Sequence, residues 1–201
     1  MWEAWTGKRY ADRGLLILGE SCYNWLGESG NVERPQTDHP VILVKGQLSE
    51  PPDRGFGFMW KLTRAVTGVC EPDAERRDAG WHSVGFTNYV PVSVGFGSGR
   101  RPSPTAWEQA RAEWPKLRDR LRPRNVIVLG LENWRNLPPT AKSFGDDEKF
   151  DSSDSVTNRW RDYRLPDGWV TRCWCHWHPR AGASWTSIRD AIAKAEVPGR
   201  P

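Results

Sequence analysis

Leu15-Leu16-Ile17-Leu18-Gly19 is the stretch that decides the fold, and Val126-Ile127-Val128-Leu129-Gly130 repeats its pattern. Each is an apolar run followed at once by glycine, which is typical of parallel strands buried on both faces of a sheet. Residues 84–88 and 170–177 are two further candidate strands. The turn residues Pro166-Asp167-Gly168 precede the last of these, which predicts a β-hairpin around them.

Helical patterns separate these strands. Residues 57–66 carry an apolar stripe at helical spacing. Ser103 followed by Pro104 is a typical helix start, and Ser184 is expected to cap a last helix. Pro115 lies inside the second of these helices, where it predicts a kink or a restart. The alternation of strands and helices predicts an α/β fold, a three-layer α/β/α sandwich around a central four-stranded, mostly parallel sheet.

The composition indicates one folded domain. The chain has 201 residues, of which 37% are hydrophobic and 27% are charged, so it can fill a core without being disordered. No apolar run reaches the ~18 residues of a membrane span, and the first residues lack a signal-peptide core. We therefore expect a cytoplasmic, monomeric protein with a single domain over residues 1–201. Within it, residues 138–158 are expected to form a mobile acidic loop and residues 197–201 a tail.

Charge and cysteine content narrow the choice of partners. The net charge of +4 permits binding to nucleic acid without requiring it. The 4 cysteines are too few for a disulfide framework in a chain of this length. On a strand, Cys173 and Cys175 would face away from His176 and His178, so the four cannot readily hold one metal ion. We expect neither a metal nor a cofactor.

Three strand ends carry polar residues in apolar surroundings. They are Gly-Glu-Ser-Cys-Tyr-Asn-Trp at 19–25, Gly-Phe-Thr-Asn-Tyr-Val-Pro-Val at 85–92, and His-Trp-His-Pro-Arg-Ala-Gly-Ala-Ser-Trp at 176–185. In a parallel sheet these ends meet at one edge, where ligands of open α/β folds bind. The edge would then hold a carboxylate, a carboxamide, a phenol ring and an imidazole.

These three motifs, in this order, resemble those of the uracil-DNA glycosylase superfamily. GESCYN takes the place of GQDPYH in the best-known branch, FTNYVPV that of the middle strand, and HPRAGASW that of the second catalytic motif. The resemblance covers residues 14–196. It implies a monofunctional DNA glycosylase that flips a base out of the DNA and hydrolyses its N-glycosidic bond. Uracil is the default base, and another deaminated or modified base is the alternative.

The resemblance also implies roles for the residues that carry out the chemistry. Glu20, the only acid of the first motif, would position water and balance the positive charge on the sugar. His178 would donate a hydrogen bond to the negative charge that develops on the departing base. Ser21 stands where the best-known branch has its catalytic Asp, and backbone N–H groups near it would assist.

Further residues would bind the base and the DNA. Tyr23 would stack on the flipped base, Asn88 would read its edge, and Asn24 replaces the last His of the family's first motif. The best-known branch has a bulky wedge after its second motif, and Arg180 would fill the base stack in its place. A glycine-rich loop presents Arg100 and Arg101 to phosphates, and Ser184 is a further expected DNA contact.

The sequence is compatible with three alternatives. In the first, the protein is a non-catalytic nucleic-acid-binding member of the same fold. In the second, it is a glycosylase that acts on modified bases of foreign phage DNA. In the third, Ser21 is the nucleophile of an enzyme that resembles SGNH-type esterases. That family has an Asp three residues before its His, and Cys175 stands at this position, so the triad would lack its orienting acid.

Overall fold

The computed structural model describes residues 2–26, 32–33, 35–55, 57–96, 99–140, 142–144 and 159–197. Most of the expected acidic loop, residues 145–158, and all but the first residue of the expected tail lie outside the described residues. No helix of the described part is long and apolar enough to cross a membrane.

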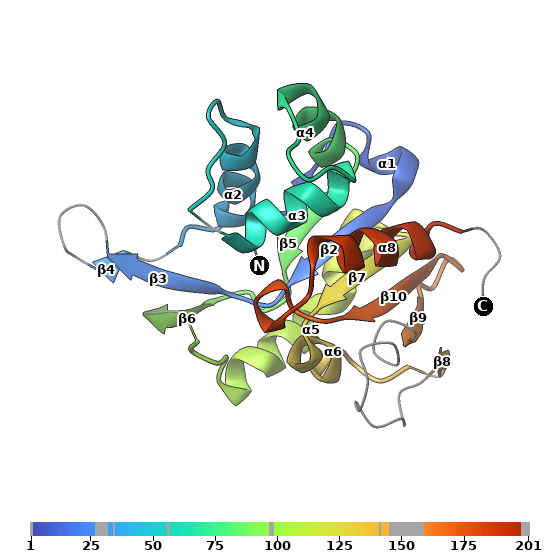
Figure 1. Cartoon of the computed structure of the whole chain (residues 1–201). Helices are drawn as coiled ribbons and strands as arrows, with labels where there is room; N and C mark the ends of the chain where they lie inside the picture. Colours follow the sequence, from blue (N-terminus) through green and yellow to red (C-terminus); the bar gives the residue numbers. More distant parts are fainter. Residues whose placement is uncertain are drawn as a thin grey trace.

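A mixed, mostly parallel sheet of seven strands forms the centre of this α/β protein (Figure 1). In sheet order its strands are β1 (Trp5–Thr6), β5 (Gly85–Asn88), β2 (Leu15–Gly19), β7 (Asn125–Leu129), β10 (Val170–His176), β9 (Trp160–Arg164) and β8 (Lys142–Phe144). The four central strands, β5, β2, β7 and β10, are parallel to one another and coincide with the four predicted strands. The prediction of four strands in all is wrong, because three antiparallel strands extend the two edges.

Two of the edge strands, β1 and β8, have a simple reason for escaping prediction. They have only 2 and 3 residues, so no apolar run marks them. The predicted hairpin is confirmed, because β9 and β10 pair antiparallel with Arg164 opposite Val170 across the turn.

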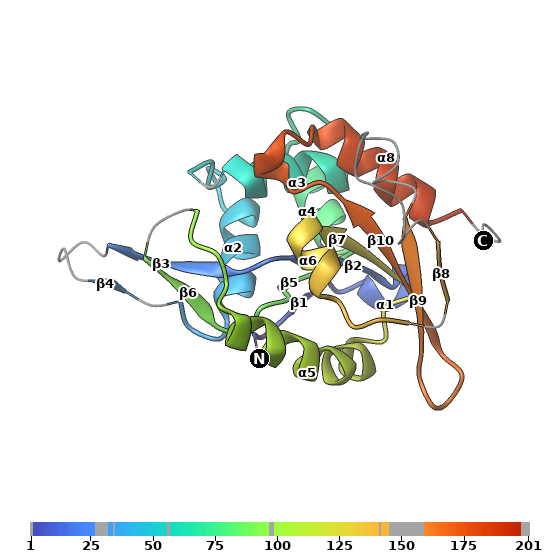
Figure 2. The same ribbon diagram turned by 90° about the horizontal axis from the view of Figure 1, so that it is seen from below.

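Helices cover both faces of the sheet (Figures 1 and 2). One face carries α2 (His39–Leu48), α3 (Gly57–Thr67), α4 (Ala74–Trp81) and α8 (Trp185–Ala195), and the other α5 (Pro104–Leu121) and α6 (Leu131–Asn136). Two short helical turns, α1 (Tyr10–Arg13) and η1 (Pro179–Ala181), lie in connections. A hydrophobic core lies on each face of the sheet, and alternate residues of β2 pack into the two cores. Leu15 and Ile17 pack on the first face, and Leu16 and Leu18 pack on the second.

Both predicted helix caps are confirmed. The Ser103 hydroxyl accepts the Ala106 N–H at 3.1 Å, and the Ser184 hydroxyl accepts the Ser187 N–H at 3.0 Å. The predicted restart at Pro115 is wrong, because α5 runs through it as one helix. Buried side chains of the same helix before and after the proline fill one core, and this packing stabilises the helix on both sides of it.

A second, smaller sheet extends from the strand ends. It consists of β4 (Val32–Glu33), β3 (Cys22–Leu26) and β6 (Ser93–Phe96) in that order, and we call it the arm. The chain enters β3 shortly after β2 and β6 shortly after β5, and β3 and β6 again pair parallel. Figures 1 and 2 show the arm projecting beyond the main sheet. The polar segments that follow two of the predicted strands therefore continue as strands themselves, β3 and β6.

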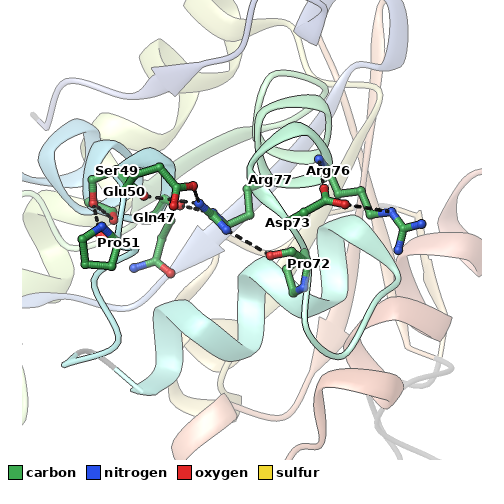
Figure 3. A network of polar contacts seen from close by, with 9 residues as sticks. Gln47, Ser49, Glu50, Pro51, Pro72, Asp73, Arg76 and Arg77 are labelled. Carbon is green, nitrogen blue, oxygen red and sulfur yellow. Dashed lines mark hydrogen bonds and ion pairs between the residues drawn. The ribbon is translucent and has the colours of Figure 1, made fainter.

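A buried arginine joins α4 to the segment after α2 (Figure 3). Arg77 is 4% exposed. Its guanidinium donates to the carbonyl oxygens of Gln47 at 2.9 Å, Pro72 at 3.0 Å and Ser49 at 3.3 Å, and it pairs with the Glu50 carboxylate. These bonds satisfy carbonyl groups where α2 ends and fix α4 against it.

Candidate functional site

The ends of the four parallel strands gather the residues of the candidate site. Glu20 follows β2, Asn88 ends β5, Gly130 follows β7, and His178 lies two residues beyond β10. Because these strands are parallel neighbours, all four positions share one edge of the sheet. The order of strands therefore brings together three of the residues that the motifs singled out.

Glu20 and His178 both lie close to Gly130. A Cβ atom added to Gly130 would lie 3.7 Å from the His178 Cβ and 3.8 Å from the Glu20 Oε2. Gly130 has a φ of +104°, a conformation that favours glycine. The glycine after the second apolar run thus lies next to both a carboxylate-bearing and an imidazole-bearing residue.

Burial and two neighbouring charges set the state of the Glu20 carboxyl group. The residue is 8% exposed, and its burial raises its pKa above the usual value. The Glu132 carboxylate raises this pKa further, whereas Arg101 lowers it. The Arg101 guanidinium lies 3.6 Å from the Glu20 Oε2 and is itself largely exposed. An arginine from the loop after the arm therefore favours the ionised form of Glu20.

The His178 imidazole is neutral near pH 7. Burial lowers its pKa to about 4, helped by the positive charges of Arg180, Arg101 and Lys61. Its Nδ1 accepts the Arg180 N–H at 3.2 Å, so the single hydrogen of the neutral ring belongs on Nε2. The Phe58 ring stacks at a centroid distance of 6.4 Å. His178 is thus a neutral donor with Nε2–H available to a ligand.

The loop that carries His178 is held by a lysine that sequence reasoning missed. Lys61 lies on α3, and its Nζ donates to the carbonyl oxygens of Pro179 at 2.7 Å and Ala183 at 3.4 Å. Ser184 is occupied as the cap of α8, as described above. Both ends of the loop are therefore tied to helices, which limits the movement of His178.

Asn88 lies against β2, and its amide already has a partner. The residue is 7% exposed, and its Nδ2 donates to the Cys22 Sγ at 2.8 Å. A Cβ atom at Gly19 would lie 2.3 Å from the Asn88 Oδ1, so only glycine permits this approach. Burial raises the pKa of the Cys22 thiol to about 12, so the sulfur stays protonated. Cys22 belongs to the site, although only the motif around it pointed there.

The other residues of the first motif face different surroundings. Tyr23 and Asn24 are adjacent in β3, so their side chains leave opposite faces of the arm. Asn24 accepts a hydrogen bond from the Ser93 hydroxyl of β6 and so joins two strands. The buried Ser21 hydroxyl has no hydrogen-bond partner among the described residues. No imidazole in the described part is therefore hydrogen-bonded to the Ser21 hydroxyl, as an activating base would be.

The expected DNA-contacting arginines are all exposed. Arg100 and Arg101 precede α5, and Arg180 lies in η1. Arg101 reaches the strand ends through its contact with Glu20. Arg180 also contributes the backbone N–H that His178 accepts.

A second residue that sequence reasoning missed supports the end of β2. Asn133 on α6 is fully buried, and its Nδ2 donates to the Gly19 carbonyl oxygen at 3.0 Å. This bond fixes the backbone immediately before Glu20. A short helical segment with two asparagines offers no sequence signal for such a role.

A surface hollow lies beside this site and does not include Glu20 or Asn88. It has a volume of about 580 Å³ and lies between the end of β10, the η1 loop and α8. His176, Trp177, Ser184, Ser187 and Lys194 are among the residues that line it.

Comparisons of the sequence with known protein families and with curated proteins found no match. Among the described residues, no three His, Cys, Asp or Glu side chains gather where they could hold a metal ion.

Proposed function

We propose that this protein is a monofunctional DNA glycosylase with a uracil-DNA glycosylase-like fold. The observation that carries the proposal is the pair formed by the Glu20 carboxyl and the neutral His178 imidazole, which both lie close to Gly130. The pair lies at the ends of parallel strands, beside Asn88. The three motifs that supply these residues occur in the order that the superfamily resemblance requires.

The chemistry follows from these two groups. Breaking the bond between C1′ of the sugar and the base nitrogen leaves the electron pair on the base, while the sugar becomes cation-like. The Nε2–H of His178 donates a hydrogen bond to a base carbonyl oxygen, where this negative charge accumulates. The Glu20 carboxylate stabilises the sugar and orients a water whose oxygen bonds to C1′. The proton of that water balances the charge on the released base.

The surrounding residues bind the substrate in this proposal. Tyr23 stacks on the flipped base, and Asn88 reads its edge after exchanging its bond to Cys22 for one to the base. Asn24 holds the strand next to Tyr23 in place. Ser21 supplies its backbone N–H rather than its hydroxyl.

Release of bases from a panel of modified DNA duplexes and single strands tests this function. Uracil is the first base in the panel, followed by other deaminated bases and by modified bases of the kind found in phage DNA. Strand cleavage in alkali reports each abasic site. We expect Asn88→Ala and His178→Ala to abolish release while DNA binding persists. Unchanged rates in both variants would overturn the assignment.

A non-catalytic nucleic-acid-binding protein of the same fold is the second candidate. The bond from Asn88 to Cys22 favours it, because the amide that should read a base already has a protein partner. This candidate predicts DNA binding with no abasic product from any member of the panel. Cys22→Ala separates the two, because it frees the amide: a glycosylase keeps or gains activity, and a binding protein remains inactive.

A further inference from the structure

The arm, which continues from the strand ends that carry the candidate site, exposes an aromatic side chain. Phe96 is 47% exposed and Val92 is 37% exposed, a large fraction for apolar side chains. Only Ile42 and Val197 are comparable among the large hydrophobic residues of the described part. A half-exposed aromatic ring offers a flat apolar face on which a ligand can stack.

Two arginines follow Phe96 closely in the chain. Phe96 pairs with Asn24 at the end of β6, two residues further along β3 than the pair of Cys22 and Ser93. Arg101 lies 3.6 Å from the Glu20 carboxylate at the strand ends. Arg100 is exposed immediately before it. The stretch between the arm and α5 therefore carries an exposed aromatic ring and two exposed guanidinium groups, one of which reaches the site.

We propose that Phe96, Arg100 and Arg101 form a docking surface for a nucleic-acid strand. The Phe96 ring stacks on a base that neighbours the nucleotide held at the site, and the two arginines contact phosphates. Stacking platforms beside positive charge are the usual means of holding an unpaired strand, because every base has a flat face. Charge disfavours a second copy of this chain as the occupant, since the chain carries a net charge of +4. The surface deepens the proposed function, on which its placement beside a flipped base rests.

Binding of undamaged DNA tests the surface separately from catalysis. The probe is a fluorescein-labelled 12-nucleotide single strand, compared by anisotropy with a duplex of the same sequence. We expect Phe96→Ala to weaken binding of the single strand about tenfold and Phe96→Trp to restore it. Arg100→Gln and Arg101→Gln should each reduce the slope of log affinity against log salt by about 0.7.

Matched variants make the outcome decisive. Val197→Ala removes a similarly exposed apolar side chain two residues beyond α8 and should leave binding unchanged. Figure 1 shows the C-terminal end of α8 on the side of the main sheet away from the arm. Equal affinities of the wild type, Phe96→Ala and Phe96→Trp would overturn the proposal, as would a loss of affinity in Val197→Ala of the same size. Binding that depends on Phe96 without any base release would retain the docking surface and contradict the glycosylase. Base release that is insensitive to Phe96→Ala would retain the glycosylase and contradict the docking surface.

Discussion

His178 illustrates how individual residues set the chemistry of the site. Three cations and burial all disfavour a further positive charge on its ring, so its pKa falls to about 4. Glu20 is shifted the other way, because burial and Glu132 disfavour its carboxylate and only Arg101 supports it. The two groups close to Gly130 are thereby suited to different tasks. His178 is a neutral hydrogen-bond donor, and Glu20 is a carboxylate base.

Base release should lose activity on the acidic side as Glu20 takes up a proton. The pKa of Glu20 is raised, so this loss begins above the usual carboxyl range, before His178 becomes charged near pH 4. Arg101→Gln removes the charge that opposes the shift, so the acidic limb of the pH–rate profile should move to higher pH. Arg122→Gln, in a distant surface ion pair with Asp167, is the control. An acidic limb that stays in place in Arg101→Gln would show that Glu20 does not control it.

The free energy of unfolding should depend on pH because the pKa of His178 is lowered in the folded protein. The unfolded chain binds a proton at this residue near pH 6.5, whereas the folded protein binds one only near pH 4. Between these values the unfolded state holds more protons, so stability falls as the pH falls. In His178→Gln this part of the slope should disappear when urea unfolding is measured at pH 6.5, 5.5 and 4.5. Parallel pH dependence in the wild type and the variant would contradict the lowered pKa.

Sequence reasoning predicted part of the site at this scale. Glu20, Asn88 and His178 could be brought to one edge because each follows a recognisable strand, and parallel strands end together. The contacts of Asn88 with Cys22 and of Asn133 with Gly19 could not be predicted. They join residues far apart in the chain through the direction of single side chains, which no periodicity reports.

Among the elements, the arm is the largest departure from expectation. The residues of β3 and β6 are mixed in polarity and short, so neither motif reads as a strand by itself. They become strands because β2 and β5 are adjacent and parallel, and their continuations can pair again beyond the main sheet. The partner strand, which is not local in sequence, determines the structure here.

The contact between α3 and the His178 loop should matter for catalysis. Lys61→Met removes the hydrogen bonds to the carbonyl oxygens of Pro179 and Ala183 while keeping the aliphatic stem. The loosened loop should lower the rate of base release by roughly tenfold, since small displacements of a reacting group are costly. The His178 pKa should also rise toward 6.5 as a nearby charge is lost, which NMR titration measures.

Two comparisons distinguish positioning from a general loss of stability in that variant. Lys61→Arg keeps a cationic donor and should recover most of the rate and keep the lowered pKa of His178. Lys45→Met changes an exposed lysine on α2 and should affect neither. An unshifted His178 pKa in Lys61→Met would argue that the lysine only packs against the loop.

The buried arginine between α2 and α4 should contribute strongly to stability. Arg77→Met leaves the carbonyl oxygens of Gln47, Ser49 and Pro72 without their donor and should cost about 2–4 kcal/mol in the free energy of unfolding. The Glu50 carboxylate is 64% exposed, so Glu50→Gln should cost less than about 1 kcal/mol. Arg76→Met, at the exposed neighbour, should be nearly neutral. Urea unfolding followed by tryptophan fluorescence measures all three, and equal losses in Arg76→Met and Arg77→Met would refute the network's role.

At the scale of the whole molecule, the sheet separates two cores that tryptophans help to fill. Trp81 packs in the first core, Trp114 and Trp134 in the second, and all three are at most 1% exposed. Sequence periodicity predicted the inward face of α5, including Trp114, because that helix is long. The positions of Trp81 and Trp134 in the short helices α4 and α6 were not predictable, since so few turns show no stripe.

Leu16 and Ile17 provide a test of how the two cores are coupled, because they are adjacent in β2 and pack on opposite faces. Leu16→Ala should cost about 2–5 kcal/mol and Ile17→Val about 0.5–1.5 kcal/mol, each from lost packing in one core. The two side chains pack in different cores, so the losses should add to within about 0.5 kcal/mol in the double variant.

The shared sheet determines the form of the unfolding transition in these variants. Tryptophan fluorescence and circular dichroism should report a single coincident transition. Both cores pack against β2 and β7, so neither core stays packed once these strands separate. The control is Ile42→Ala, which changes a side chain that is 49% exposed and should leave the transition in place. Leu16→Ala could instead produce two transitions, with the helices of the other core unfolding later. Each core would then stabilise its own helices independently. The strand ends that carry Glu20 and His178 would then not be fixed by the cooperative folding of one sheet.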